Sequence, residues 1–259
     1  MACRHKGVGP GKGGAAMFGL GIDHGERYAD YVVLAKGTRG KPELVRWGRA
    51  CARNLSCGGW VDLTGWARRV TNAGGVLALD APLQNARMSN SHHGLGLNPR
   101  FADARCAEAA LRVCGMAVSW PTGPSLDPWV VSAQATAAVL KAATRDRLEV
   151  IETWPHGSYR RLGGPSLPQP PGQKKSRVGR SFRAHLLDVL VPGLHARACP
   201  TTGFWWSADR LDATACAIVA LRYAMGRNAI TCFRCPCPGL GPHGCGSTHR
   251  DDGSAIWLL

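Results

Sequence analysis

The stretch Phe18-Gly19-Leu20-Gly21-Ile22-Asp23 predicts a buried β-strand that ends on a carboxylate. Its apolar residues favour a strand, and its two glycines allow another segment of backbone to approach closely. Asp23 occupies the last position, and the turn-like pair His24-Gly25 follows it. The strand therefore delivers an acidic side chain to one end of the sheet that it joins.

Two further stretches share this arrangement. Val76-Leu77-Ala78-Leu79-Asp80 is an apolar run that ends on Asp80, and a proline breaks it two residues later. Leu148-Glu149-Val150-Ile151-Glu152 ends on Glu152, again shortly before a proline. Three strands with acids at their C-terminal ends predict one open sheet with carboxylates along one edge. In open α/β sheets that edge is where ligands bind.

The remaining elements predict an α/β fold. Residues 28–35 and 43–50 predict two more strands, which form an antiparallel meander with the first. Helices are predicted where apolar residues recur at helical spacing, and these ranges are 60–73, 100–114, 125–145, 181–190 and 207–225. The region between Pro99 and Arg145 is then a helical insertion in the domain.

The charge of the chain favours a polyanionic partner. Its formal net charge is +15, which suits nucleic acid, either DNA or RNA. A basic surface that reflects arginine-rich composition alone is the alternative. The distribution argues for a binding surface, because Asp188 is the only acid between Thr153 and Pro200. We expect phosphate contacts that do not read sequence from Lys174, Lys175, Arg177, Arg180 and Arg183.

The organisation of the chain is predicted in three parts. Residues 1–16 are rich in glycine and basic residues without an apolar core, so we expect a flexible basic tail and not a secretory signal. Residues 17–230 form the main domain, and residues 231–259 form a Cys/Gly-rich loop and a C-terminal strand that packs on it. The eleven cysteines are expected to be reduced, which predicts a cytoplasmic location. No apolar run reaches the roughly 18 residues of a membrane span, so we expect no membrane partner. The sequence makes no prediction of oligomeric state.

The last predicted helix carries two more acids. Asp209 and Asp212 are three residues apart and therefore share one helix face. Placed beside Asp23 and Asp80, they would complete a cluster of four carboxylates, which a divalent cation stabilises against mutual repulsion. Hard oxygen ligands suit Mg²⁺ or Mn²⁺. The candidate metal ligands are these four residues, and Glu152 joins them as a candidate catalytic residue. Taken singly, each acid could instead cap a turn or interact with a helix dipole.

These motifs together resemble a known family. The set consists of Gly21-Ile22-Asp23, Ala78-Leu79-Asp80-Ala81-Pro82, Ile151-Glu152-Thr153-Trp154-Pro155 and Asp209-x-x-Asp212-Ala213. It resembles a domain-of-unknown-function family of predicted RNase H-like nucleases, and the Asp-x-x-Asp-Ala helix is similar to that of Holliday-junction resolvases. The resemblance implies an RNase H-like mixed five-stranded sheet, in which three antiparallel strands are continued by parallel strands and flanked by helices. It also implies metal-dependent hydrolysis of phosphodiester bonds.

Three alternatives remain open. A non-catalytic nucleic-acid-binding module would keep the fold and the basic surface but would need no metal. A phosphotransferase of the same superfamily would need two copies of the fold and glycine-rich phosphate loops, which this chain lacks. A zinc site is an alternative to a cysteine-rich surface loop near the C-terminus, and its candidate ligands are Cys232, Cys235, Cys237 and Cys245.

Overall fold

The computed structural model describes residues 16–37, 40–51, 57–83, 105–116, 127–163, 174–226, 230–233 and 255–259. Nearly all of the predicted basic tail lies outside these ranges. Of the four candidate zinc ligands only Cys232 is described, and the other three lie outside the described residues. None of the helices in the described part of the chain is long and apolar enough to cross a membrane.

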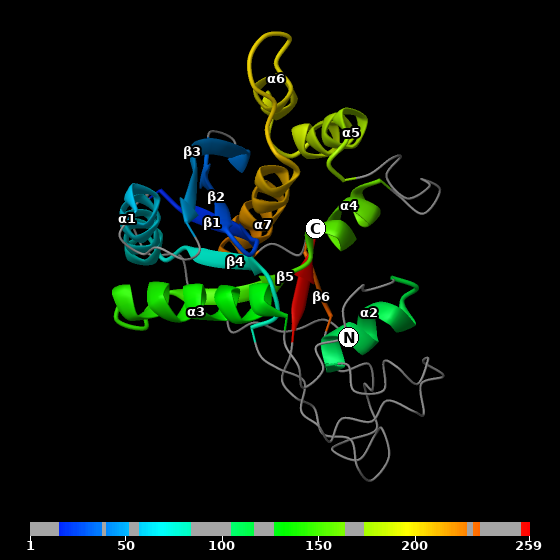
Figure 1. Ribbon diagram of the computed structural model, residues 1–259. Helices are drawn as coiled ribbons and strands as arrows, with labels where there is room; N and C mark the ends of the chain where they lie inside the picture. Colours follow the sequence, from blue (N-terminus) through cyan, green and yellow to red (C-terminus); the bar gives the residue numbers. More distant parts are fainter. Residues whose placement is uncertain are drawn as a thin grey trace.

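A single mixed sheet forms the centre of the structure (Figure 1). Its strand order is β3-β2-β1-β4-β5-β7-β6. Three antiparallel strands, β1 to β3, are followed by β4, β5 and β7, which run parallel to β1, and by β6, which is antiparallel to β7. Their bounds are β1 Phe18–His24, β2 Tyr28–Lys36, β3 Pro42–Cys51, β4 Val76–Asp80, β5 Glu149–Thr153, β6 Thr231–Phe233 and β7 Ile256–Leu258.

This topology agrees with the predicted RNase H-like arrangement, and only the strand count differs. The prediction gave five strands, whereas the described sheet has seven. The two additional strands are the short β6 and β7, which continue the sheet beyond β5. The strand β7 corresponds to the predicted C-terminal strand, whereas β6, with three residues, leaves too little alternation to be recognised from sequence.

Seven helices are described. Their bounds are α1 Gly58–Asn72, α2 Cys106–Val113, α3 Pro128–Ala143, α4 Pro155–Leu162, α5 Arg177–Asp188, α6 Leu194–Ala198 and α7 Ala208–Ala224. The helix α5 begins four residues before its predicted start, because the Ser176 hydroxyl caps it by accepting a hydrogen bond from the Gly179 amide. The helix α4 was not predicted. Pro155 stands at its first position, where the missing N–H is not needed.

The sheet is covered on both faces. The helices α1 and α3 pack on one face through a core that includes Leu20, Ile22 and Leu79. The helices α7, α4 and α5 pack on the other through a core that includes Ala78 and Ile151. Because side chains alternate along a strand, each residue's position decides which helices it meets. We call the second surface the α7 face of the sheet.

The packing of α7 on β1 is unusually close. A Cβ atom added at Gly21 would collide with the backbone of Ala213 and Ala217, and one added at Gly19 would collide with the backbone of Ala217 and Leu221. The two glycines therefore let the helix backbone rest directly on the strand backbone. This contact fixes the start of α7 against the end of β1.

Gly21→Ala should destabilise the protein by about 1–3 kcal/mol, because backbone atoms of α7 cannot move aside as a side chain can. The measurement is the free energy of unfolding from urea denaturation monitored by circular dichroism. Gly65→Ala is the matched control, since nothing lies within 4 Å of a Cβ at that position in α1. The control should be stabilised by up to about 1 kcal/mol through its better helix propensity. Equal stability of wild type and Gly21→Ala would contradict the close contact.

Candidate metal centre

Two acids lie side by side where β1 and β4 end. Asp23 and Asp80 are register partners across this parallel pair. Both occupy positions that alternate onto the α7 face, in phase with Gly21 and Ala78. Asp23 is only 8% exposed, and Asp80 is partly buried. The register of two strands therefore places two carboxylates together in a site with little access to water.

The helix α7, which packs on this face of the sheet, supplies the third acid. Ser207 caps the helix by accepting a hydrogen bond from the Arg210 amide, and Asp212 lies just over one turn inside. Oxygen atoms of Asp23, Asp80 and Asp212 all lie within 4.8 Å of one another. This acidic cluster joins two strand ends and one helix start, and its position near the positive end of the helix dipole favours negative charge.

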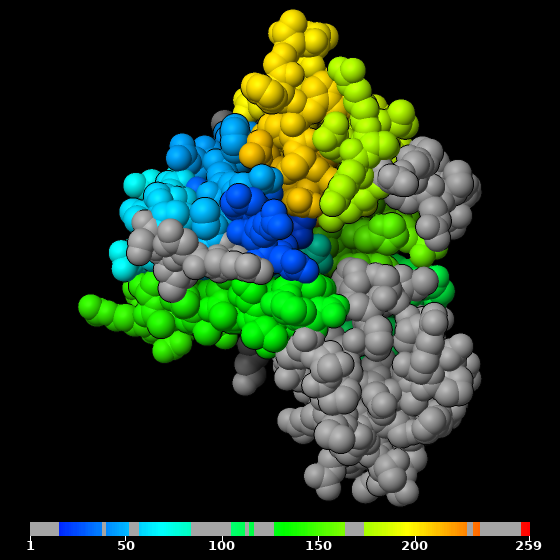
Figure 2. Space-filling model, viewed as in Figure 1, coloured from blue at the N-terminus to red at the C-terminus, as the bar shows by residue number. Residues whose placement is uncertain are grey.

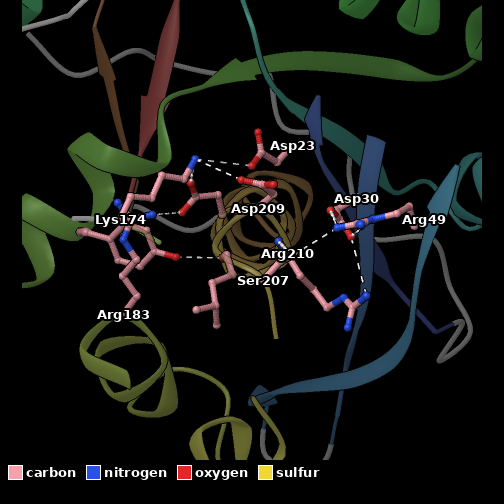
Figure 3. A network of polar contacts seen from close by, with 11 residues as sticks. Asp23, Asp30, Arg49, Lys174, Arg183, Ser207, Asp209 and Arg210 are labelled. Carbon is pink, nitrogen blue, oxygen red and sulfur yellow. Dashed lines mark hydrogen bonds and ion pairs between the residues drawn. The ribbon is translucent and has the colours of Figure 1, made fainter. Parts of the chain in front are cut away.

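Two cationic side chains enter the acidic cluster from α5 and the residues just before it. The Lys174 ammonium lies 2.6 Å from Asp212 Oδ2, 3.6 Å from Asp209 Oδ1 and 3.8 Å from Asp23 Oδ2. Arg183 Nη1 lies 2.5 Å from Asp212 Oδ1. Viewed along α7, Lys174 and Arg183 lie on one side of the helix, while Arg210, Asp30 and Arg49 lie on the other (Figure 3). The acids thus carry internal counter-charges.

Asp209 lies at the rim of the acidic cluster. Its side chain is 47% exposed, and it is not among the three acids that share the 4.8 Å limit. It nevertheless reaches the same lysine as Asp212, and its charge contributes to the raised pKa of Asp23. The predicted pairing of Asp209 and Asp212 on one face is therefore present, with one acid inside the cluster and the other at its solvent side.

Glu152 is not among the three acids whose oxygen atoms lie within 4.8 Å of one another, and its predicted catalytic role stays a prediction. Its register partner on β4 is Leu79, which points to the face covered by α1 and α3. Residues paired across parallel strands point the same way, so Glu152 starts from the opposite face of the sheet to Asp80. Its charge nevertheless adds to the raised pKa of Asp80, and both acids line one small pocket. Glu152 meets Arg105, whose Nη1 lies 2.5 Å from Oε2, and accepts a hydrogen bond from the Leu83 amide. A one-residue difference in register accounts for the separation.

Burial and repulsion raise the pKa values of the clustered acids. Burial is the largest cause for Asp23, and the neighbouring Asp80 charge adds to it, so its pKa lies well above the usual value. Burial also raises the pKa of Asp80 to about 7, with the Asp212 charge next in importance, while the Lys174 charge opposes both effects. A cluster that would repel itself when fully ionised is suited to a cation of higher charge.

The residues present fit a divalent metal ion. Three carboxylates offer oxygen atoms, the ligands that Mg²⁺ and Mn²⁺ prefer. Asp23 Oδ2 is buried without a hydrogen-bond partner, although such atoms are nearly always paired. An ion bound among Asp23, Asp80 and Asp212 would supply that missing partner.

The five predicted phosphate contacts divide into two groups. Lys175 and Arg177 are exposed and Arg180 is partly exposed, as expected for a binding surface. Arg183 is only 2% exposed and pairs with Asp212, so it faces the acidic cluster and not the solvent. Lys174 is also directed to the cluster. Sequence spacing placed these residues on one segment but could not show which side chains turn inward.

Comparison with known proteins places the chain in a family. The model of "Protein of unknown function (DUF429)" matches residues 21–233. The chain belongs to this family. The match spans the three acids of the cluster and confirms the resemblance drawn from the motifs around them. No curated protein matches the chain.

Solved structures of resolvases are similar to this DUF429 protein. Thermus thermophilus RuvC has 14% sequence identity, a TM-score of 0.41, and coverage of 81% of this chain and 97% of that chain. The T. thermophilus RuvC complex with a Holliday junction substrate has 13% identity, the same TM-score and the same coverage. The yeast mitochondrial Holliday junction resolvase Ydc2 has 12% identity, a TM-score of 0.38, and coverage of 80% and 78%.

The raised pKa of Asp80 predicts a pH-dependent stability of the metal-free protein. In the unfolded chain the carboxyl ionises near 3.8, whereas in the folded protein its pKa is about 7. Between these values the folded state holds a proton that the unfolded state has lost, so stability falls as pH rises through this window. Asp80→Asn removes this contribution and should stabilise the metal-free protein by about 1–3 kcal/mol at pH 8.

The measurement is urea unfolding in EDTA at pH 5 and pH 8. Wild type should lose more stability between the two pH values than Asp80→Asn does. Asp127→Asn is the control, because this exposed acid is not among the clustered carboxylates and its charge is not among the causes that raise the pKa of Asp80. The same pH dependence in wild type and Asp80→Asn would contradict the shifted ionisation.

Proposed function

We propose that this protein is a metal-dependent nuclease that hydrolyses phosphodiester bonds in nucleic acid. The observation that carries the proposal is the meeting of Asp23, Asp80 and Asp212 at the carboxyl edge of the sheet. A structural salt bridge needs one acid, whereas three buried or partly buried acids within 4.8 Å cost stability and call for a multivalent partner.

The proposed metal ligands are Asp23, Asp80 and Asp212, with Asp209 as a further ligand at the solvent side of the cluster. Mg²⁺ or Mn²⁺ bound there would supply Lewis-acid stabilisation of a phosphate and a water molecule of lowered pKa. The protein itself holds the acids in place through the β1–β4 register and the seat of α7 on β1. Arg183 orients Asp212 through its ion pair and stacks over the Tyr159 ring, with its guanidinium carbon 4.7 Å from the ring centroid.

Nucleic acid is the proposed substrate because of charge. The chain has a formal net charge of +15, and exposed basic residues lie on α5, which packs against α7. Arg177 and Arg180 stack beside the Trp205 ring, with guanidinium carbons 4.5 and 5.9 Å from its centroid. With Lys175 they are the proposed phosphate contacts, and phosphate contacts of this kind position a backbone without reading its sequence.

A non-catalytic nucleic-acid-binding module is the second candidate. The observation in its favour is that Lys174 and Arg183 already neutralise Asp212 from two sides. If these ion pairs were permanent, the acidic cluster would be structural. Metal dependence separates the two functions, because only the nuclease requires a cation for turnover.

Asp23→Asn should reduce metal-dependent cleavage by on the order of 10³-fold or more, because the site loses a charged ligand while packing is preserved. The measurement is the rate of cleavage of labelled single-stranded, duplex and branched DNA and RNA with Mg²⁺, Mn²⁺ or EDTA. Asp62→Asn is the matched control. Asp62 binds Tyr31 and Arg46, not the acidic cluster, so its variant should cleave like wild type. Cleavage by Asp23→Asn at the wild-type rate would remove Asp23 from the mechanism.

Lys174→Gln should bind Mn²⁺ more tightly than wild type. A metal ion entering the site must displace the Lys174 ammonium from Asp212 or share the acids with it. Removing that competing charge should lower the dissociation constant on the order of tenfold. Isothermal titration calorimetry with MnCl₂ measures this without any activity. Lys175→Gln is the control, because this neighbouring lysine is exposed and makes no ion pair among the described residues. Identical affinities for all three proteins would show that Lys174 does not compete with the metal.

A further inference from the structure

The α7 face of the sheet is only partly covered at its outer strand. The helix α7 packs mainly on β1, β2 and β4 and only marginally on β3. On this face Val32 and Leu34 of β2 are fully buried beneath the helix, whereas Tyr28 of β2 and Trp47 of β3 remain partly exposed. Polar residues normally occupy such positions in a soluble protein, but here aromatic and arginine side chains occupy them.

Four residues form this surface, which we call the outer-strand platform. Trp47 and Arg49 of β3 are two of them, and they are the register partners of Val32 and Asp30 of β2. Tyr28 is the third, and it faces the same way because it lies two residues before Asp30 along β2. Trp47 is 44% exposed and Tyr28 is 47% exposed. The fourth member is Arg210, from the first turn of α7. Figure 2 shows the first strands (blue) and the segment around the start of α7 (yellow to orange) side by side at the surface.

The platform is held together by stacking and by one shared acid. The Arg210 guanidinium carbon lies 3.9 Å from the Trp47 ring centroid, and the Arg49 guanidinium carbon lies 5.2 Å from that of Tyr28. Asp30 binds Arg49 at 2.6 Å and Arg210 at 3.8 Å. The two arginines share Asp30 as their close carboxylate, and the Asp209 charge also acts on Arg49. Trp206, which is buried, packs against Trp47 in a tilted arrangement with ring centroids 5.7 Å apart.

The platform is continuous with the acidic cluster. Asp23 is the register partner of Asp30, and Asp30 is the register partner of Arg49. The three residues therefore lie in one row across adjacent strands, which places Arg49 about 10 Å from Asp23 at the usual strand spacing. Figure 3 shows the same row, with Asp30 and Arg49 beside Arg210. A ligand seated on the platform would reach the cluster by passing the start of α7, where Arg49 lies 3.5 Å from the Ser207 hydroxyl.

We propose that the outer-strand platform binds a single-stranded stretch of nucleic acid, with bases stacked on Trp47 and Tyr28 and phosphates near Arg49 and Arg210. Exposed aromatic rings interleaved with arginines match the chemistry of unpaired bases, whose π-faces are accessible only outside a duplex. This inference rests on the proposed nuclease function and narrows its substrate to nucleic acid with an unpaired segment beside the scissile bond.

The test is fluorescence anisotropy in EDTA, so that no cleavage occurs. The probes are labelled oligothymidylate, labelled oligouridylate and a blunt DNA duplex of the same length. Trp47→Ala should weaken binding to both single strands on the order of tenfold and leave duplex binding unchanged. Trp47→Phe should restore most of the affinity, because it keeps an aromatic face. Tyr28→Ala should also weaken binding to both single strands. Because Tyr28 is slightly more exposed than Trp47, its variant tests the proposal even if Trp47→Ala folds poorly.

Trp66→Ala is the matched control. This tryptophan of α1 also carries a stacked arginine, with the Arg69 guanidinium carbon 4.8 Å from its ring centroid, but it belongs to the core on the other face of the sheet. Its variant should bind single strands like wild type. Three results would overturn the proposal, because each shows that unpaired bases are not recognised there. The platform variants could lose affinity equally for single strands and for duplex, or Trp47→Ala and Tyr28→Ala could lose none. Polyglutamate could also displace the labelled single strand as well as an unlabelled single strand does.

The two proposals fail in different measurements. Trp47-dependent single-strand binding in EDTA without metal-dependent cleavage of any substrate would support the platform and overturn the nuclease. Metal-dependent cleavage that Asp23→Asn abolishes, with wild-type binding by both platform variants, would support the nuclease and overturn the platform.

Discussion

Direct backbone contact between β1 and α7 is the constraint on which the site depends. A strand with glycines at positions 19 and 21 presents no side chain to the helix, so the helix lies closer than side chains normally permit. The strand residue two positions after Gly21 is Asp23, and the helix residue just before Ala213 is Asp212. The contact that brings the two backbones together therefore also brings the two acids together, at a desolvation cost that the packing of the core has to offset.

The acidic cluster holds two side-chain cations, and a bound metal ion would have to displace them or share the acids with them. Lys174 and Arg183 reduce the repulsion between the acids, and in this arrangement Asp212 is the most fully neutralised of the three. Asp23 keeps a buried oxygen without a hydrogen-bond partner. The Lys174 and Arg183 side chains differ in how easily they could move away from the acids. Lys174 is 40% exposed and precedes α5, whereas Arg183 is almost fully buried inside that helix. A metal ion entering the site would therefore exchange with the lysine and keep the arginine as a fixed support for Asp212.

The sequence was sufficient for the features that local patterns encode. Apolar runs that end on Asp23 and Asp80 predicted two parallel strands and a shared edge, and the Asp-x-x-Asp spacing predicted the helix face. Register was beyond reach, because it depends on long-range pairing. Glu152 ends its strand just as Asp80 does, yet it pairs with Leu79 and so starts from the other face. Tertiary contacts were likewise beyond reach for Arg183. Its spacing resembles that of its exposed neighbours, although its side chain is buried against Asp212.

The short segment before α7 links the surfaces on both sides of the acidic cluster. Trp205 turns toward α5 and stacks with Arg177, whereas Trp206 turns toward β3 and packs against Trp47. Phe204, just before them, is 99% exposed. Ser207 then caps the helix that carries Asp212. Because consecutive residues serve both sides, a shift of this segment would move the α5 contacts, the outer-strand platform and the acidic cluster together. If nucleic acid binds along either side as proposed, this segment is the direct covalent connection through which binding would act on the position of the acids.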